Sequence, residues 1–289
     1  MQNLRGGGPL AINHHVQAMS ILLRLRTPMN RITSAAPALA FERICVESFI
    51  YQSATIMLFD STLDLVSTVQ QLVKKFESCF ITGSESLPSS CFDKLPHSSV
   101  LGASPDVFVV LMQETKLARS AQLLTEASAN NLRHQNWQIL HREQHSQSSG
   151  LREIWEGRLY VLATRALVIR DAYTRNRSTS DFHAFEFHQT IIEGLQILST
   201  YTLRAPFKNY YLLPLAIFGS VLTSEDDVAV IREKFDLITE RSNRSTIKHI
   251  RDILEEVWRS QAGSTENFAI DGLGMLLRCA NITNPTSDS

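Results

Sequence analysis

Two histidines lie four residues apart in the segment His141-Arg142-Glu143-Gln144-His145. At this spacing both side chains project from one face of a helix, as the zinc ligands of many metalloproteases do. In those enzymes a glutamate directly follows the first histidine and acts as general base on the metal-bound water. Here Glu143 stands two positions after His141, about 200° around a helix. His134 is a further candidate ligand, but the surrounding sequence is strongly polar, so we favour a solvent-exposed helix face over a metal site.

A second candidate site is a row of four basic residues that share one side if a single helix carries them: Arg241, Arg244, Lys248 and Arg251. Such a row could bind an acidic partner or the phosphates of a nucleic acid. Asp252 and Glu255 follow Lys248 and Arg251 at the four-residue spacing that allows ion pairs along a helix. The acids therefore neutralise part of the row, and a solvated face is favoured.

The serines and glycines show no arrangement that supports catalysis. No Gly-x-Ser-x-Gly nucleophile motif is present, and no glycine-rich loop leads into a helix to hold a phosphate. We therefore expect this chain to be no enzyme and to carry no catalytic, cofactor-binding, metal-binding or DNA-binding residue.

Charge and cysteine usage narrow the class of protein. The 289 residues contain 28 Lys and Arg against 29 Asp and Glu, a formal net charge of -1, so the chain has no positive excess for holding nucleic acid tightly. The cysteines Cys45, Cys79, Cys91 and Cys279 have no paired spacing, which favours a reducing compartment. No secretory signal is visible at the start, and the uncharged run 209–224 is shorter than the about 20 apolar residues that cross a membrane. These features predict a soluble intracellular protein.

Apolar residues recur at helical spacing through most of the chain, whereas alternating strand patterns are nearly absent. The segment from Phe41 to Phe59 is apolar on most sides, as in a helix buried among others. Amphipathic rows follow within the ranges 65–80, 151–173, 228–238 and 247–258. We therefore predict an all-α fold, a single large domain of roughly eight to eleven packed helices.

The most apolar passage is YYLLPLAIFGSVLTSEDD, residues 210–227. We predict that Pro214 lies in the first turn of a buried helix and that Gly219 lets another backbone approach closely. Thr223 is the expected cap of the next helix, whose first turn carries acids. Two helices would then meet at a tight corner, and Trp258 is predicted to share its core.

The same passage, extended to YYLLPLAIFGSVLTSEDDVAVIREKFDLI and followed by IRDILEEVWRS, resembles the C-terminal half of the fungal-specific transcription factor domain. FERICVESFIYQSATIMLFD is similar to the early helix of that family, and SSVLGASPDVFVVLMQETKLARSAQLL to its middle segment. The matching segments occur in the family's order. Asp227 departs from the pattern, since a basic residue is expected there after the acid pair.

The resemblance implies the regulatory region of a zinc binuclear cluster transcription factor, located in the nucleus. It implies a domain over residues 41–281, with an N-terminal extension at 1–40 that has room for a short helix and a C-terminal tail at 282–289. Zinc is expected only in an N-terminal six-cysteine cluster of the full-length protein, because no Cys-x-x-Cys pair occurs in this chain. The implied partners are other transcription regulators or coactivators, with homodimerisation left open. DNA would be reached only through such a cluster or a partner, and no membrane is involved.

Two further functions stay open on the residues alone. A helical scaffold or ligand-binding protein would have the same fold without a role in transcription. A metal-dependent enzyme would use His141 and His145. The sequence also leaves open whether the chain is a fragment of a regulator or a stand-alone protein.

Overall fold

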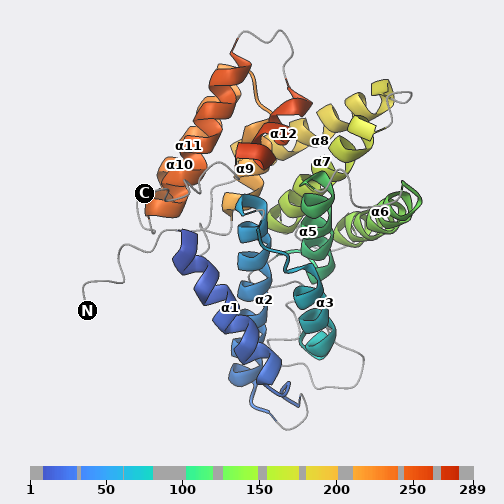
Figure 1. The fold of residues 1–289 in the computed structure, drawn as a ribbon, viewed down its shortest axis with the longest axis vertical. Coiled ribbons are helices and arrows are strands. Elements are labelled where there is room, and N and C mark those ends of the chain that lie inside the picture. Colours follow the sequence, from blue (N-terminus) through green and yellow to red (C-terminus); the bar gives the residue numbers. More distant parts are fainter. Residues whose placement is uncertain are drawn as a thin grey trace, which may run out of the picture.

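The computed structural model describes residues 9–30, 34–60, 62–80, 102–119, 126–148, 155–175, 180–200, 211–239, 244–262 and 268–279 (Figure 1). Within these ranges the helices are α1 (Pro9–Leu25), α2 (Ala36–Phe59), α3 (Val66–Lys75), α4 (Glu77–Phe80), α5 (Pro105–Arg119), α6 (Glu126–Ser148), α7 (Trp155–Arg175), α8 (Ser180–Thr200), α9 (Leu212–Ser220), α10 (Glu225–Thr239), α11 (Arg244–Gln261) and α12 (Ile270–Cys279). Only α4 is a single turn. The described residues contain no strand, only one isolated bridge between Leu222 and Phe268, so the predicted all-α fold is confirmed.

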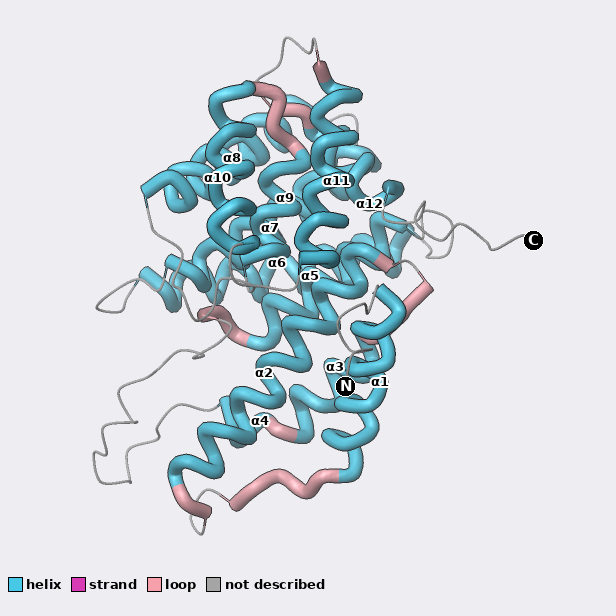
Figure 2. The backbone as a smooth tube through the Cα atoms, turned by 90° about the vertical axis from the view of Figure 1, so that its left-hand side faces the viewer, coloured by secondary structure: helices cyan, strands magenta, loops and turns pink. Residues whose placement is uncertain are grey.

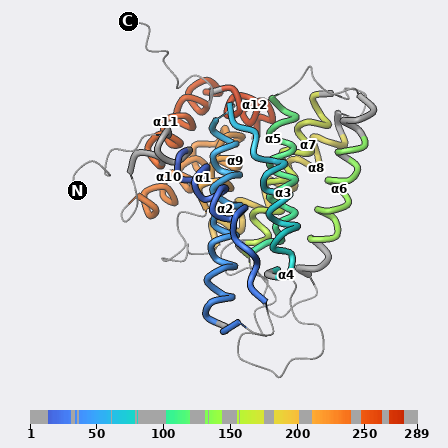
Figure 3. The backbone as a smooth tube through the Cα atoms, turned by 60° about the horizontal axis from the view of Figure 1, so that its bottom comes forward, coloured from blue at the N-terminus to red at the C-terminus, as the bar shows by residue number. Residues whose placement is uncertain are grey.

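The helices form one packed body with α7 at its centre. α7 packs against α8 along its length and also contacts α5, α6 and α9. α5 lies between α7 and α2. α1 runs along the outside of α2, as Figures 2 and 3 show. The C-terminal helices α10, α11 and α12 enclose α9. A single apolar core runs through these contacts.

The amphipathic rows read from the sequence mark the buried faces of the helices. All the predicted core residues of α10 and α11 are buried: Val228, Ile231, Phe235, Ile238, Ile247, Ile250, Leu254, Val257 and Trp258. The row 65–80 is divided between α3 and α4, which are separated at Phe76. The expectation that 41–59 is buried on most sides is wrong at its start, because Phe41 and Ile44 are exposed.

Polar contacts from α2 and α3 hold the C-terminal end of α1. Lys75 of α3 donates to the carbonyl oxygens of Leu23 (3.3 Å) and Arg24 (2.6 Å), which are among the acceptors left unsatisfied where a helix ends. The Arg24 guanidinium donates to Thr68 Oγ1 at 2.6 Å. α1 is therefore fixed against α3 by both its main chain and its side chains.

The turn after α1 is tied to α2 by the carboxylate of Glu42, which is buried. Glu42 Oε1 accepts a hydrogen bond from Arg26 Nε (2.9 Å) and Oε2 accepts one from the Met29 backbone N–H (3.0 Å). Residues assigned to an extension on sequence grounds thus pack on the helices that follow them. The boundaries 1–40, 41–281 and 282–289 stay predictions.

α9 and α12 are in close backbone contact at Gly272. A Cβ atom built at this position would lie 1.9 Å from the backbone oxygen of Ser220, the last residue of α9. No side chain fits in that space. Two residues along α12, a Cβ atom at Gly274 would meet the guanidinium of Arg170 at 2.9 Å, the far end of a flexible side chain.

We therefore expect Gly272→Ala to be destabilising by about 3 kcal/mol or more, because the methyl group forces α12 away from α9. Gly274→Ala is the matched control on the same helix. It should leave stability unchanged or raise it by up to about 1 kcal/mol, because alanine favours the helix. Urea unfolding followed by circular dichroism measures both. Equal stability of the two variants would show that α12 does not pack on α9 as described.

Candidate functional site

The corner between α9, α10 and α11 contains the passage that the sequence singles out. Every residue of α9 is buried, and Pro214 lies in its first turn as predicted. Trp258 of α11 is buried too, and its indole Nε1 donates a 2.7 Å hydrogen bond to the Gly219 backbone oxygen. The prediction that Trp258 shares the core of this corner is confirmed.

Side chains, not another backbone, approach Gly219. A Cβ atom at this position would lie 3.2 Å from Ile231 Cγ2 of α10 and 3.2 Å from Leu254 Cδ1 of α11. The close backbone contact that the sequence predicted here occurs instead at Gly272. The absence of a side chain at Gly219 therefore leaves room for side chains of α10 and α11 to pack against α9.

Beyond α9, the chain finds its hydrogen-bond partners in the segment before α12. The Ala269 backbone N–H donates to Val221 O at 2.8 Å, next to the bridge between Leu222 and Phe268. The side-chain amide of Gln261, oriented so that both ends are satisfied, donates to Leu222 O (3.1 Å) and accepts from the Gly272 N–H (3.2 Å). These bonds join the ends of three helices into one unit.

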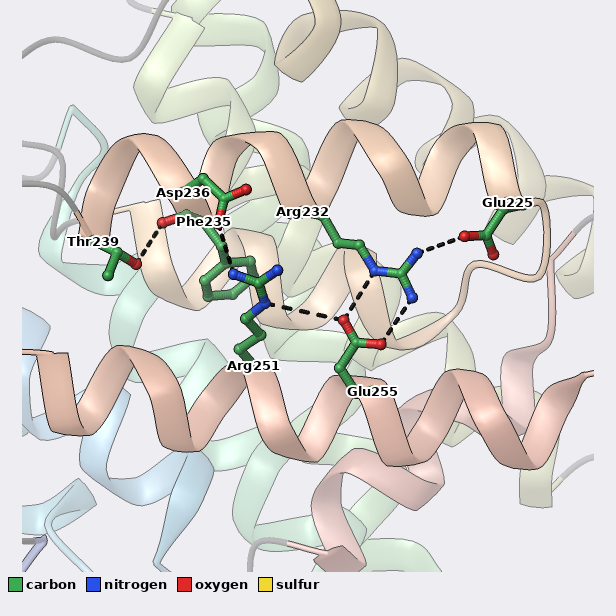
Figure 4. A network of polar contacts seen from close by, with 7 residues as sticks. All are labelled: Glu225, Arg232, Phe235, Asp236, Thr239, Arg251 and Glu255. Carbon is green, nitrogen blue, oxygen red and sulfur yellow. Dashed lines mark hydrogen bonds and ion pairs between the residues drawn. The ribbon is translucent and has the colours of Figure 1, made fainter.

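Five charged side chains form a network between α10 and α11: Glu225, Arg232, Asp236, Arg251 and Glu255 (Figure 4). Arg232 binds both oxygens of Glu255, at 2.9 and 2.8 Å, and also donates to Glu225 at 2.5 Å. Arg251 donates to Asp236 at 2.6 Å. Asp236 lies four residues after Arg232 on α10, and its partner Arg251 lies four residues before Glu255 on α11. The two helices are therefore antiparallel.

The network lies over the buried corner. The Arg232 guanidinium is 5.0 Å from the centre of the Trp258 ring, within range of a cation–π interaction. Hydrogen bonds from Arg232 lower the pKa of the Glu255 carboxyl below its usual 4.5, with the positive charge of Arg232 as a further cause. The same hydrogen bonds raise the pKa of Arg232. Both groups are thus held in their charged forms.

The residue predicted to cap α10, Thr223, is not the residue that precedes the helix. α10 begins at Glu225, so Ser224, not Thr223, directly precedes it, and the Val228 N–H donates to Ser224 O at 3.0 Å. Asp227, where the resemblance leads us to expect a basic residue, is partly buried. Burial raises the pKa of Asp227, as does the negative charge of Asp226, while a hydrogen bond from Ser224 opposes the change.

The two described side chains of the predicted basic row, Lys248 and Arg251, do not form a free cationic surface. Arg251 turns towards α10 and pairs with Asp236 and Glu255. Lys248 is exposed, while Arg241 and the side chain of Arg244 lie outside the described residues. Of the four positions, only Lys248 is therefore described as a side chain that projects into solvent.

The histidine segment lies on α6, which extends to Ser148. His134 and His141 are exposed, and the side chain of His145 is outside the described part. Glu143, the residue compared with a general base, accepts a 3.0 Å hydrogen bond from the Ser104 backbone N–H just before α5. Among the residues that the structure describes, no group of three or more His, Cys, Asp or Glu side chains is placed to hold a metal ion.

Two surface rows of apolar side chains were missed by sequence reasoning. Ile21, Leu22 and Leu25 project from α1, and Phe182, Phe185 and Ile192 from α8, where they follow one face at helical spacing. An exposed apolar row is typical of a protein–protein contact. Across the described ranges, no helix combines the length and apolar character needed to cross a membrane.

A family model described as Fungal specific transcription factor domain matches residues 82–271, about two thirds of the chain. The match covers the corner of α9, α10 and α11 and the network above it. No curated protein and no solved structure matches the chain.

Replacing Trp258 tests the packing of this corner. Trp258→Ala should cost about 3 to 5 kcal/mol, because it leaves a large cavity under Arg232. Trp258→Phe fills most of the space but leaves the Gly219 oxygen without its indole donor, and it should lower stability by about 1 to 2 kcal/mol. Thermal and urea unfolding give both values. A Trp258→Ala variant that melts within a degree or two of the wild type would contradict the buried position.

Glu255→Gln tests the network, with Glu256→Gln as its matched control. Glu256 pairs with Arg259 on the exposed side of the same helix. Because the folded-state pKa of Glu255 is lowered, its carboxylate adds stability above about pH 4.5 and loses that contribution as pH falls through the folded pKa. Glu255→Gln should thus cost about 1 kcal/mol at pH 7, after allowance for partial exposure, and the cost should decrease as pH falls below about 4.5. Equal losses of stability in the two variants at pH 7 would show that the network does not stabilise the contact between α10 and α11.

Proposed function

Because the chain belongs to the Fungal specific transcription factor domain family, we propose that it is the regulatory domain of a fungal transcriptional regulator. It acts in the nucleus, in RNA polymerase II transcription, by binding protein partners or an effector. The observation that carries this proposal is the match over residues 82–271, which contains the packed corner with its helix α9. The family is one of transcription factor domains and is not an enzyme class.

Several observations support action through partners over direct reading of DNA. The net charge is -1, and Arg251 of the basic row is already paired with two carboxylates. Specific DNA binding requires base contacts in addition to phosphate contacts. In this proposal DNA is reached through a zinc cluster of the full-length protein or through a partner that has its own reading module.

The surface of the described helices supports the same proposal. α1 and α8 each present large apolar side chains to solvent, and Phe182 and Phe185 are about two-thirds exposed, at 66% and 65%. Burying such side chains is the main source of affinity in protein contacts. The partners we propose are other transcription regulators or coactivators.

The test is a fusion of residues 1–289 to a heterologous DNA-binding domain, measured with a reporter gene whose promoter carries the matching site. We expect the fusion to raise or lower reporter output relative to the DNA-binding domain alone. A fusion of the Gly272→Ala variant, in which α12 packs less tightly on α9, is the control and should weaken the effect. A silent wild-type fusion under every nutrient condition would favour a helical scaffold without a role in transcription.

The unfused chain should bind DNA weakly and without sequence preference, and binding should fall steeply with salt because only phosphate contacts are available. Fluorescence anisotropy with random and genomic duplexes near physiological salt measures this. Sequence-selective binding by residues 1–289 alone would overturn this part of the proposal.

A further inference from the structure

α1 carries apolar side chains on two sides, whereas a helix on a protein surface normally carries them on one. Its inner side, with Val16 and Leu23, is buried against α2 and α3. Its outer side carries Ala18, Ile21, Leu22 and Leu25, which are all exposed. Leu22 and Leu25 are 67% and 78% exposed. We call these four residues the α1 outer face.

The α1 outer face cannot turn inward without breaking polar contacts. Lys75 binds the last carbonyl oxygens of α1, and Arg24 binds Thr68. Arg26, one residue after Leu25, is held by the buried Glu42. The fold thus holds Leu22 and Leu25 in solvent at a fixed position, and a preorganised surface loses little conformational entropy when a partner binds.

The exposed charge around this face is predominantly positive. The first acidic residue of the chain is Glu42, and of the arginines that precede it the structure describes Arg24 and Arg26. The carboxylates of Glu42 and Glu47 are buried and paired with Arg26 and Arg43. At the described end of the bundle where α1, α2 and α3 meet, Arg24 and Lys74 are exposed cations beside the paired Arg26, against Glu77 as an exposed acid. An apolar row beside these cations complements an apolar row flanked by acids.

We propose that the α1 outer face docks an acidic amphipathic helix of a partner protein. This inference deepens the proposed function, on which it rests, by naming the chemistry of the partner. Two copies of the chain meeting through α1 would bring like charges together. Nucleic acid would leave the leucines without an apolar contact.

The exposed row on α8 supports no such choice of partner. Its neighbouring acids Glu186 and Glu193 are neutralised by Arg165 and Arg158 of α7, so the charge there favours no class of ligand. Ile192 in that row is 46% exposed and provides a matched control for substitutions on α1.

The test uses purified residues 1–289 and two labelled helical peptides of one design. Both carry leucine at i, i+3, i+4 and i+7, and the remaining surface is glutamate in one and lysine in the other. Fluorescence anisotropy should show saturable binding of the glutamate peptide that weakens with added salt, and no binding of the lysine peptide. Leu22→Ser with Leu25→Ser should weaken binding by about tenfold or more, and Ile192→Ser should not change it. Circular dichroism confirms that each variant is folded, as expected for exposed positions.

Four results would overturn the proposal: no saturable binding of the glutamate peptide, equal binding of the lysine peptide, no effect of the double substitution, or an equal effect of Ile192→Ser. A concentration-dependent dimer that the double substitution dissolves would assign the face to a second copy. Displacement of the peptide by vesicles of phosphatidylserine and phosphatidylcholine, but not of phosphatidylcholine alone, would assign it to an anionic lipid surface. The assay involves no reporter, so peptide binding with a silent fusion would overturn the regulatory function alone, and an active fusion without peptide binding would overturn only this surface.

Discussion

The burial of α9 is the constraint on which the C-terminal half of the structure depends. A helix with nine buried residues gains apolar burial on all its sides, but the carbonyl oxygens at its end must find donors away from water. Trp258 supplies one donor to Gly219, and Ala269 supplies another to Val221 just beyond the helix. Hydrogen bonds to the end of α9, together with apolar packing, therefore fix the positions of α11 and of the segment before α12.

Sequence patterns predicted the helices of this arrangement, because the spacing of apolar residues within one helix is enough to identify it. The rows on α10 and α11 mark the faces that are buried, and the apolar passage around Pro214 marks a helix enclosed by others. In each of these cases the residues that define the pattern lie within one helix, so no knowledge of neighbouring helices is needed.

The candidate site could not be predicted in the same way, because it depends on register between helices. Arg251 and Glu255 were recognised as a pair along one helix, yet the shorter contacts of both residues run to Asp236 and Arg232 on α10. The segment Asp271-Gly272-Leu273-Gly274 holds two glycines, and nothing in it shows which one meets the Ser220 oxygen. The exposure of Phe41 was missed for the same reason, since an apolar residue near the start of a helix is buried only if another element covers it.

The corner around α9 and the C-terminal end of α1 differ in how far their contacts are exposed to solvent. The corner around α9 depends on apolar burial and on hydrogen bonds shielded from water, so changes in ionic strength act on it weakly. The C-terminal end of α1 combines the burial of Leu23 with polar contacts of Lys75, Arg24 and Arg26 that are partly open to solvent. The corner thus stabilises the C-terminal fold, while polar contacts hold α1 with Leu22 and Leu25 in solvent, as the proposed docking of a partner helix requires.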